Sequence, residues 1–177
     1  MGWPSRALAA GLLLAAAGGR VAAEPRYGLG HAAALGEVAG WDIDVRPDGA
    51  GLPPGRGSVA AGAQIFAATC AACHGAHGEG ALATALAGGQ GSLASKAPVQ
   101  TVGSYWPYAT TLFDYIRRAM PLPAPQSLAP DEVYALTAYV LSLNGIVPPD
   151  AALDAASLPM VRMPNRDGFH RAPGAPP

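Results

Sequence analysis

Three segments of the chain place apolar side chains at the three- and four-residue spacing that marks one face of a helix. The first begins after Ser58, a residue that caps helix N-termini well, and carries Val59, Ile65 and Phe66 before it reaches Cys70. We therefore expect a helix that starts at Ser58 and runs into Cys70.

The second segment predicts a helix that opens at Thr111, because Asp114 stands three residues later in the arrangement of a capping box. Apolar residues then recur at helical spacing as far as Met120. Pro121 cannot continue the ladder of helical hydrogen bonds, so we expect the helix to end at Met120. Residues 122–128 predict a loop that is broken by prolines.

The third segment has the clearest helical pattern. Pro130 suits the first position of a helix, and the acidic side chains of Asp131 and Glu132 complement the positive end of the helix dipole. Residues 144–145, an Asn-Gly pair, supply the stop signal. Ala129 offers no hydroxyl group as N-cap, which costs the helix a little stability.

Glycine and proline interrupt the rest of the chain, which contains 23 glycines and 18 prolines. Residues 24–57 and 146–177 are predicted to be irregular arms, and we find no pair of strands joined by a hairpin turn. The sequence therefore predicts an all-α core of three to four helices over residues 58–145, flanked by two long irregular arms.

Residues 1–23 have the layout of a secretory signal. Arg6 supplies a positive charge, and the apolar run from Leu8 to Ala17 is too short to span a bilayer. Small residues precede a cleavage site after Ala23. We expect export and removal of residues 1–23, with an uncleaved anchor as the alternative, and no membrane span in the remaining chain.

The charge of the chain excludes one class of function. The net charge is −1, with 11 basic and 12 acidic residues, and Lys96 is the only lysine. Binding to nucleic acid needs a basic face that neutralises phosphates, whereas the only basic cluster here is the pair Arg117-Arg118. We therefore expect no nucleic-acid partner.

Both cysteines of the chain lie in one motif, Cys70-Ala71-Ala72-Cys73-His74. This Cys-X-X-Cys-His pattern is the attachment signature of c-type haem. Two thiols one helical turn apart reach the two vinyl groups of one porphyrin, and the adjacent imidazole binds the iron as proximal ligand. We expect one covalent haem c on Cys70, Cys73 and His74, in a protein exported to the periplasm.

Other uses of a Cys-X-X-Cys pair fit this chain less well. A thioredoxin-like redox pair requires a βαβ setting, which the sequence does not predict. A zinc site lacks its second pair of ligands, because the remaining histidines have no metal-binding spacing. A chance histidine after two core cysteines is the simplest alternative. An exported chain without further cysteines has no disulfide framework to build, which agrees with haem attachment.

Three methionines after the first residue are candidates for the ligand on the other side of the iron: Met120, Met160 and Met163. In small monohaem cytochromes, which this arrangement resembles, the axial methionine lies just before the last helix, at the place of Met120. Met160 and Met163, in the C-terminal arm, are alternatives, as are a histidine and an open site. Methionine is also an ordinary core residue.

Histidine and methionine together fill both axial positions of the iron, which raises its reduction potential and leaves no vacancy for oxygen or substrate. Such a site favours electron transfer over catalysis. An open site would instead indicate an enzyme or a sensor.

Several residues near the motif fit a haem protein. Tyr105, Trp106 and Tyr108 are candidates to line the haem edge, and Arg117 or Arg118 is a candidate to neutralise a propionate. Core or surface packing is an equal alternative for each of them.

Gly62, Phe66 and Tyr139 resemble the small and aromatic residues at which the first and last helices of class I cytochromes cross. A glycine at such a crossing permits close approach of two backbones. Simple core packing would place the three residues in the same way.

Longer stretches of the chain resemble one family. They are residues 39–49, 88–93, 101–111, 115–121 and 161–169. Together they resemble the cytochrome subunit of sulfane (sulfur) dehydrogenase from the bacterial Sox thiosulfate-oxidation system, and they are similar to cytochrome subunits of periplasmic sulfite dehydrogenases. The resemblance covers most of residues 37 to 170.

The resemblance implies a class I cytochrome c fold and a partner. In that family the cytochrome pairs with a molybdenum-cofactor subunit that oxidises sulfur compounds, and electrons pass from molybdenum to haem and then to a soluble carrier. It implies haem attachment at Cys70, Cys73 and His74 and a sixth ligand at Met120. Arms that cannot bury a core alone often wrap another surface, so both arms are candidates for partner contact.

This chain departs from the family in two respects. Family members often carry two haem domains, whereas only one haem motif is present here. Residues 81–87 lack the proline that usually lies near this place, which leaves open the carbonyl that holds the second ring nitrogen of His74. A free-standing periplasmic electron carrier between respiratory complexes and a haem-free thiol redox protein are the competing hypotheses.

Overall fold

The computed structural model describes residues 29–170 and residue 174. The chain divides into two units, Met1–Ala34 and Leu35–Pro177. In the first unit, the described residues 29–34 form no helix or strand, and every described element belongs to the second unit. The predicted secretory signal, residues 1–23, lies outside the described residues.

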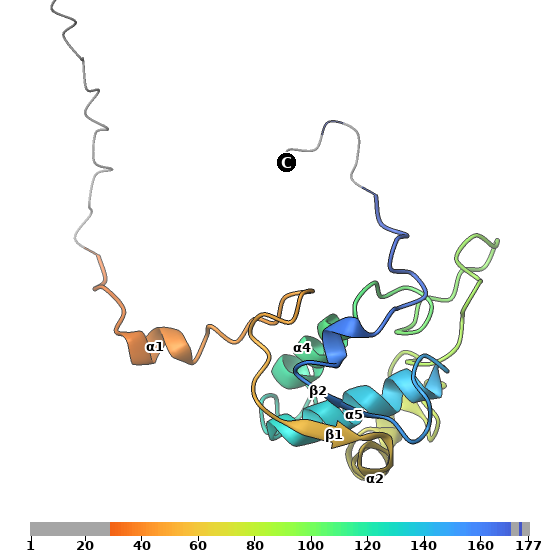
Figure 1. Ribbon diagram of the computed structural model, residues 1–177, viewed down its shortest axis with the longest axis horizontal. Helices are drawn as coiled ribbons and strands as arrows, with labels where there is room; N and C mark the ends of the chain where they lie inside the picture. The colour runs from red at the N-terminus through yellow and green to blue at the C-terminus, as the bar shows by residue number, and fades with distance from the viewer. Residues whose placement is uncertain (1–28, 171–173, 175–177) are drawn as a thin grey trace, which may run out of the picture. The chain divides into compact units, whose positions relative to one another are not determined.

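The second unit is mostly helical (Figure 1). Its elements in chain order are α1 (Leu35–Ala39), β1 (Arg56–Ser58), α2 (Val59–Thr69), α3 (Ala71–His74), α4 (Ala109–Ala119), α5 (Pro130–Leu143), β2 (Ala152–Asp154) and the 3-10 helix η1 (Leu158–Met160). The predicted helical core is confirmed, with two short strands beside it. Within the described part, no helix has the length and apolar character needed to cross a membrane.

Helices α2 and α5 pack across each other at Gly62 (Figure 1). A Cβ atom at Gly62 would overlap the carbonyl oxygen of Ala135 and lie 2.7 Å from the Cβ of Tyr139, so only glycine permits this approach. Phe66 packs on Tyr139 with the ring centroids 5.2 Å apart. The predicted crossing of the first and last core helices at these residues is confirmed.

Helices α2 and α5 begin where the sequence predicts. Ser58 Oγ accepts a hydrogen bond from the Ala61 amide at 3.2 Å, which caps α2. At the start of α5, the Glu132 carboxylate accepts from the Ala129 amide at 2.8 Å. Because Ala129 has no side-chain acceptor, only this half of a capping box forms.

Helix α4 begins at Ala109, two residues before the predicted start at Thr111. Asp114 does not cap it, so that prediction is wrong. The Asp114 carboxylate instead accepts from the Val45 amide at 3.0 Å and pairs with Arg118 at 2.6 Å. The side chain that looks like a cap in the sequence therefore ties the N-terminal arm to α4. The predicted end of the helix, at Met120, is confirmed.

The sequence did not predict the antiparallel pair of β1 and β2, in which Gly57 faces Leu153. Each strand has three residues, and no hairpin turn joins them, because the whole helical core lies between them in the chain. Strand β1 also lies directly on α5, where a Cβ at Gly57 would overlap the backbone of Ala135. The strands thus bring both arms onto the last helix.

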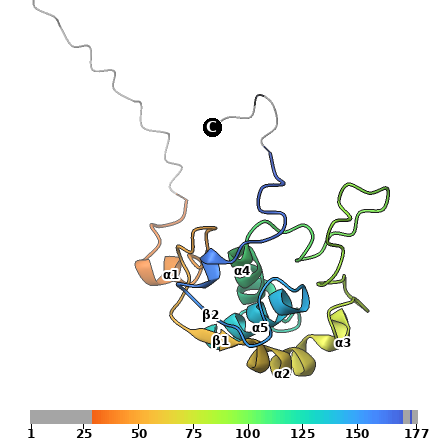
Figure 2. The same ribbon diagram turned by 45° about the vertical axis from the view of Figure 1, so that its right-hand side comes forward.

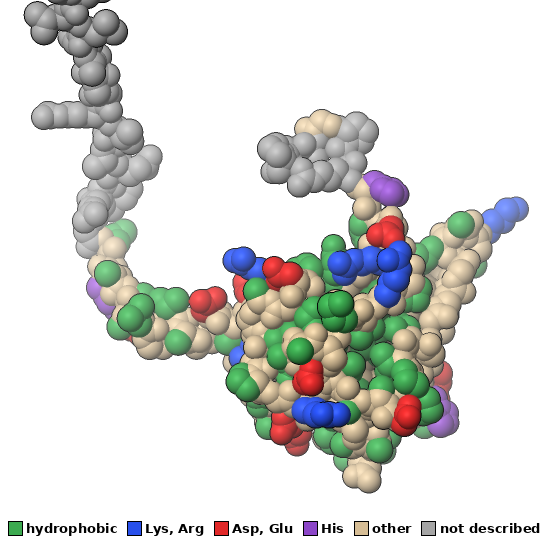
Figure 3. All heavy atoms as spheres, viewed as in Figure 1, with side chains coloured by type: hydrophobic (Ala, Val, Ile, Leu, Met, Phe, Trp, Pro, Cys, Tyr) green, Lys and Arg blue, Asp and Glu red, His purple; other side chains and the backbone are tan. Residues whose placement is uncertain are grey.

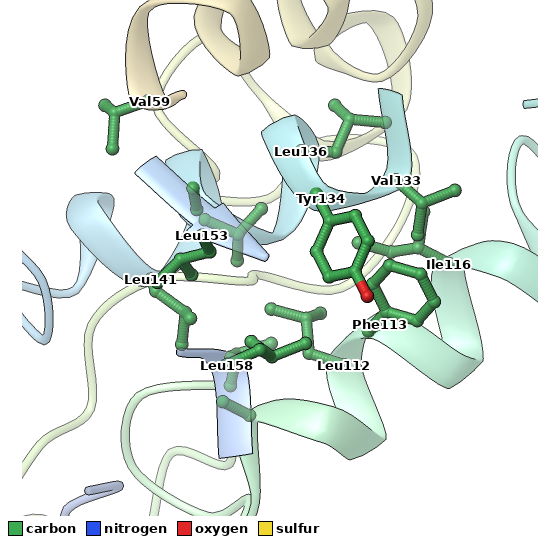
Figure 4. Packing of buried hydrophobic residues seen from close by; sticks show 14 of the residues in the cluster. Val59, Leu112, Phe113, Ile116, Val133, Tyr134, Leu136, Leu141, Leu153 and Leu158 are labelled. Atoms are coloured by element: carbon green, nitrogen blue, oxygen red, sulfur yellow. The ribbon is translucent and has the colours of Figure 1, made fainter. Parts of the chain in front are cut away.

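The core combines helix residues with residues of the C-terminal arm (Figure 4). Phe113 of α4 and Tyr134 of α5 pack with ring centroids 4.5 Å apart. Leu153 and Leu158 lie in the same cluster and are almost fully buried. Full burial of a leucine side chain contributes about 1.5–3 kcal/mol, so part of the segment predicted to be coil contributes to the core.

Residues 43–57 of the N-terminal arm are also attached to the core. Val45 and Leu52 pack against the buried cluster, and the Tyr134 hydroxyl donates to the Pro53 carbonyl at 2.9 Å. Asp44 forms an ion pair with Arg118 at 2.5 Å. This half of the arm is irregular in secondary structure but fixed in position by side-chain contacts.

Candidate functional site

Cys70, Cys73 and His74 lie on one helical turn where α2 meets α3 (Figure 2). Cys70 closes α2 and precedes α3, and its carbonyl accepts from the amides of Cys73 and His74 at 3.1 and 3.0 Å. These two hydrogen bonds hold the thiols one turn apart. Two thioether bonds to a single porphyrin require this separation.

The two cysteines are free thiols in different environments. Cys73 is exposed, whereas Cys70 is half-buried, and burial raises the pKa of Cys70 against a smaller opposing effect from the Thr69 hydroxyl. Redox-active cysteines have lowered pKa values, because the thiolate is the reactive form. The environment of Cys70 therefore disfavours a thioredoxin-like role for the pair.

The His74 ring is held by a backbone carbonyl. Its Nδ1 lies 2.9 Å from the oxygen of Thr84. A carbonyl oxygen can only accept a hydrogen bond, so Nδ1 carries the proton and Nε2 keeps its lone pair. This is the tautomer that an iron ligand needs, with the hydrogen bond to Nδ1 fixing the orientation of the ring.

The loop that carries Thr84 folds back onto the haem motif. The Ala83 amide donates to the Cys73 carbonyl at 2.8 Å, and the Leu86 amide donates to the Gly78 carbonyl at 2.7 Å. Gly78 is buried with φ of 73°, a conformation that glycine adopts without strain. The missing proline in this loop therefore does not remove the acceptor, since the Thr84 carbonyl occupies that role.

Burial distinguishes the three candidate methionines. Met120 follows α4 directly and is half-buried, packed against the edge of the core. Met163 is 1% exposed inside the core, and Met160 is 81% exposed. Met120 as sixth ligand stays a prediction, with a position at the end of a helix and partial exposure that suit it.

Trp106 and Arg117, the other predicted haem contacts, lie in different surroundings. Trp106 packs edge-on against Tyr115 with the ring centroids 5.7 Å apart. Arg117 donates to the Ile43 carbonyl at 3.3 Å, and the two residues line a cavity of about 210 Å³ together with Leu128. Arg117 thus has a partner in the N-terminal arm, and its contact with a propionate stays a prediction.

The remaining candidates from the same part of the chain contact the C-terminal arm or the N-terminal arm. Tyr105 packs edge-on against Phe169 at 5.1 Å between ring centroids, and the Arg166 guanidinium lies 4.2 Å from the centre of the Tyr108 ring. Arg118 is engaged by Asp114 and by Asp44, and the hydrogen bonds and negative charges of these carboxylates raise its pKa.

Comparison with known proteins agrees with this geometry. The Cytochrome c family model matches residues 59–144. The chain is also similar to a solved structure, the crystal structure of the sulfane dehydrogenase SoxCD from Paracoccus pantotrophus. The sequence identity is 46% and the TM-score is 0.78, over 84% of this chain and 73% of that chain. This chain belongs to the family of Sox sulfane dehydrogenase cytochrome c subunits.

A cytochrome c domain implies a covalent haem c, and the residues of this family member fit one. The two thiols are uncombined and one turn apart, and the His74 ring presents its unprotonated nitrogen away from the Thr84 carbonyl. Among the described residues, no group of three or more His, Cys, Asp or Glu side chains is placed to hold a metal ion. The two thiols and the imidazole of His74 are thus the groups that would hold a haem, while the sixth ligand stays a prediction.

Two residues that serve this cytochrome's site were not predicted from the sequence. Thr84 acts through its backbone carbonyl, which every residue has, so no side-chain pattern identifies it. Asn144 was predicted only as a helix stop, yet it is buried and hydrogen-bonded to the loop after the motif. A polar residue at the end of an apolar helix is the one signal that could have pointed to it.

Proposed function

We propose that this cytochrome subunit carries one haem c, bound through Cys70 and Cys73, with His74 and Met120 as the axial ligands. It accepts electrons in the periplasm from a molybdenum-containing subunit that oxidises sulfane or sulfite sulfur. It then passes them to a soluble downstream cytochrome. The observation that carries the proposal is the Cys-X-X-Cys-His turn whose histidine is held at Nδ1 by the Thr84 carbonyl.

The proposed axial ligands explain why this subunit transfers electrons rather than oxidising sulfur itself. A bound haem supplies a one-electron change at iron, and the protein sets its potential through the axial ligands and their hydrogen bonds. With both axial positions filled, no site remains for a substrate. The oxidation of sulfur must then take place on another subunit, and the cytochrome provides the exit for electrons.

Similarity to a sulfane dehydrogenase supports the identity of the partner. The alignment to SoxCD covers 84% of the chain, and residues 59–177 make up only about two thirds of it, so the alignment extends into the arm before Val59. The N-terminal arm is therefore shared in part with that dehydrogenase. An arm retained outside the haem domain is suited to contact with another subunit.

The beginning of the second unit offers apolar side chains for such a contact. Leu35 and Trp41 are 90% and 87% exposed, and Val38 of α1 is also exposed. On the face drawn in Figure 3, basic and acidic side chains are interspersed, in keeping with a net charge of −1. We therefore expect the partner subunit to be recognised through apolar side chains rather than through a surface of uniform charge. Aromatic residues such as Trp41 often contribute most of the binding energy of an interface.

Co-expression with the molybdenum subunit from the same host tests the proposal. We expect the two proteins to elute together, and addition of a sulfane-sulfur or sulfite substrate to reduce the haem within the complex. A cytochrome that elutes alone and stays oxidised with substrate and partner present would contradict it. That result would favour the free-standing carrier between respiratory complexes.

A further inference from the structure

Asn144, the residue after α5, directs its buried side chain toward the loop that follows the haem motif. Its Nδ2 donates to the Leu86 carbonyl at 3.1 Å and to the Val140 carbonyl at 2.9 Å. Its Oδ1 accepts from the Gly88 amide at 3.1 Å. Because two carbonyl acceptors lie beside one terminal atom of the Asn144 side chain and an N–H donor lies beside the other, the first atom is the amide nitrogen and the second is the oxygen.

The surroundings of Asn144 fix this arrangement. A Cβ at Gly103 would overlap Asn144 Oδ1, so the segment containing Gly103 closes over the side chain. The Gln90 side chain donates to the Asn144 carbonyl at 2.6 Å, and Thr101 Oγ1 donates to the Gly88 carbonyl at 2.6 Å. The Asn144 side chain therefore has little room for another rotamer.

The loop held by Asn144 carries the acceptor of the His74 ring. The Thr84 carbonyl, 2.9 Å from His74 Nδ1, stands two residues before Leu86. On the other side of Thr84, the Ala83 amide is bound to the Cys73 carbonyl at 2.8 Å. The Thr84 carbonyl therefore lies between two hydrogen bonds that fix the loop. One joins Ala83 to Cys73 of the motif, and the other joins Leu86 to Asn144 at the end of α5.

We infer that Asn144 is a positioning residue for the proximal ligand, which holds the Thr84 carbonyl against His74 Nδ1 and thereby sets the orientation and basicity of the imidazole. The inference rests on the proposed ligation of the haem iron by His74. A hydrogen bond from Nδ1–H to a carbonyl increases the donor strength of Nε2. Stronger donation stabilises the oxidised iron, so loss of this restraint raises the reduction potential.

The test uses Asn144→Ala in the holoprotein and two measurements, the midpoint potential and the exchange rate of the His74 Nδ1 proton by NMR in the reduced state. We expect a positive shift of the potential and about tenfold faster exchange, because weakening a hydrogen bond exposes its proton more often. The matched control is Thr137→Val, which removes a buried hydrogen bond of 2.7 Å to Val133 on the same helix. That hydrogen bond lies within α5, so the substitution should change neither the midpoint potential nor the exchange rate.

An Asn144→Ala protein that is less stable but keeps the parent's potential and exchange rate would overturn the inference. If that variant does not accumulate, Thr101→Val serves in its place, because it removes the hydrogen bond to the Gly88 carbonyl. This substitution is expected to raise the midpoint potential. An unchanged midpoint potential would also overturn the inference. The NMR spectrum of the parent protein distinguishes failure of the proposed ligation by His74 from failure of the positioning role of Asn144. Absence of haem-shifted His74 ring signals in the parent contradicts the ligation itself, whereas their presence with unmoved variants contradicts only the positioning role.

Discussion

At the scale of single residues, the three methionines that are candidates for the sixth iron ligand differ in their surroundings. Met120 lies half-buried at the end of α4, Met163 is enclosed by the core and Met160 faces solvent. A thioether can bind iron only if it reaches an open space beside the porphyrin. Met120 is only partly buried, and its backbone is held by the last turn of α4, so it is the methionine that we expect to bind.

We predict that Met120→Ala lowers the reduction potential and opens the iron to carbon monoxide. Loss of a thioether ligand removes a contribution that raises the potential, within the roughly 0.8 V range over which axial ligands set it. Redox titration and the visible spectrum of the reduced protein with carbon monoxide measure both effects. Met160→Ala, at a side chain 81% exposed, is the control and should leave both unchanged.

A Met120→Ala protein with the parent spectrum and potential would show that the ligand lies elsewhere. Met163 would then be the first candidate. Because Met163 is 1% exposed, its recruitment to iron would require rearrangement of the core around it.

At the scale of elements, the sequence predicts helices far better than strands. Periodicity, a capping serine and an Asn-Gly stop locate α2 and α5, because these signals are local. Strands β1 and β2 pair across most of the chain, so no local signal announces them. The start of α4 was mispredicted for a related reason: Asp114 has the spacing of a cap, but its partner, Val45, is distant in sequence.

We predict that Gly62→Ala destabilises the holoprotein by about 1–3 kcal/mol or more, because the added methyl group overlaps the Ala135 carbonyl where α2 crosses α5. Urea unfolding followed by circular dichroism measures the change. Gly36→Ala is the matched control, since a Cβ there meets nothing within 4 Å. Equal stability of the two variants would mean that the helices do not cross at Gly62.

The turn after β2 makes part of the stability dependent on pH. Asp154 accepts from the Ser157 amide and hydroxyl, each at 2.8 Å, and these bonds hold the pKa of Asp154 below its ordinary value of 3.8. A lowered pKa in the folded state adds stability that is complete above about pH 4 and is lost as the pH falls through the folded value. This turn leads into η1 and so positions Leu158.

We predict that Asp154→Asn lowers stability at pH 7 and removes part of the loss of stability between neutral and acidic pH. The two proteins should approach equal stability only once the pH has fallen below the pKa of Asp154 in the folded protein, which lies under 3.8, because the folded parent carboxylate is then protonated as well. Denaturant unfolding at a series of pH values measures the difference. A constant gap between parent and variant down to the lowest pH would contradict this role of the carboxylate.

At the scale of the whole molecule, the N-terminal arm has two parts with different expected roles. Residues from Ile43 onward are bound to α4 and α5, whereas α1 and Trp41 present exposed apolar side chains. The sequence predicts an irregular arm but not this division, since the anchoring contacts involve residues on α4 and α5. The division separates what stabilises the cytochrome from what is available to a partner.

We predict that removal of residues 24–39 together with Trp41→Ala leaves the haem spectrum and stability unchanged but weakens binding to the molybdenum subunit roughly tenfold or more. Loss of a buried aromatic anchor commonly costs 2 kcal/mol or more at an interface. Isothermal titration calorimetry measures the affinity. Removal of residues 24–57 is the contrasting variant and should impair folding, because it deletes β1 and the Pro53 carbonyl that binds Tyr134. Unchanged affinity in the shorter deletion would exclude this segment from the interface.

The site itself was predictable to the extent that its chemistry is carried by side chains. Cys70, Cys73 and His74 form a signature that needs no fold to be recognised. The Thr84 carbonyl and its support by Asn144 arise only when α5 and the loop meet in space. Residues that act through backbone groups or distant contacts have no pattern of their own in the chain.

Everything proposed for this cytochrome depends on a porphyrin joined to both thiols of α3 and its preceding residue. Mass spectrometry of the tryptic peptide that spans Cys70 and Cys73, from protein matured in an exporting host, tests this directly. The expected result is a peptide carrying the mass of one haem, with neither cysteine available for alkylation. A peptide of unmodified mass in which both cysteines are alkylated would contradict it.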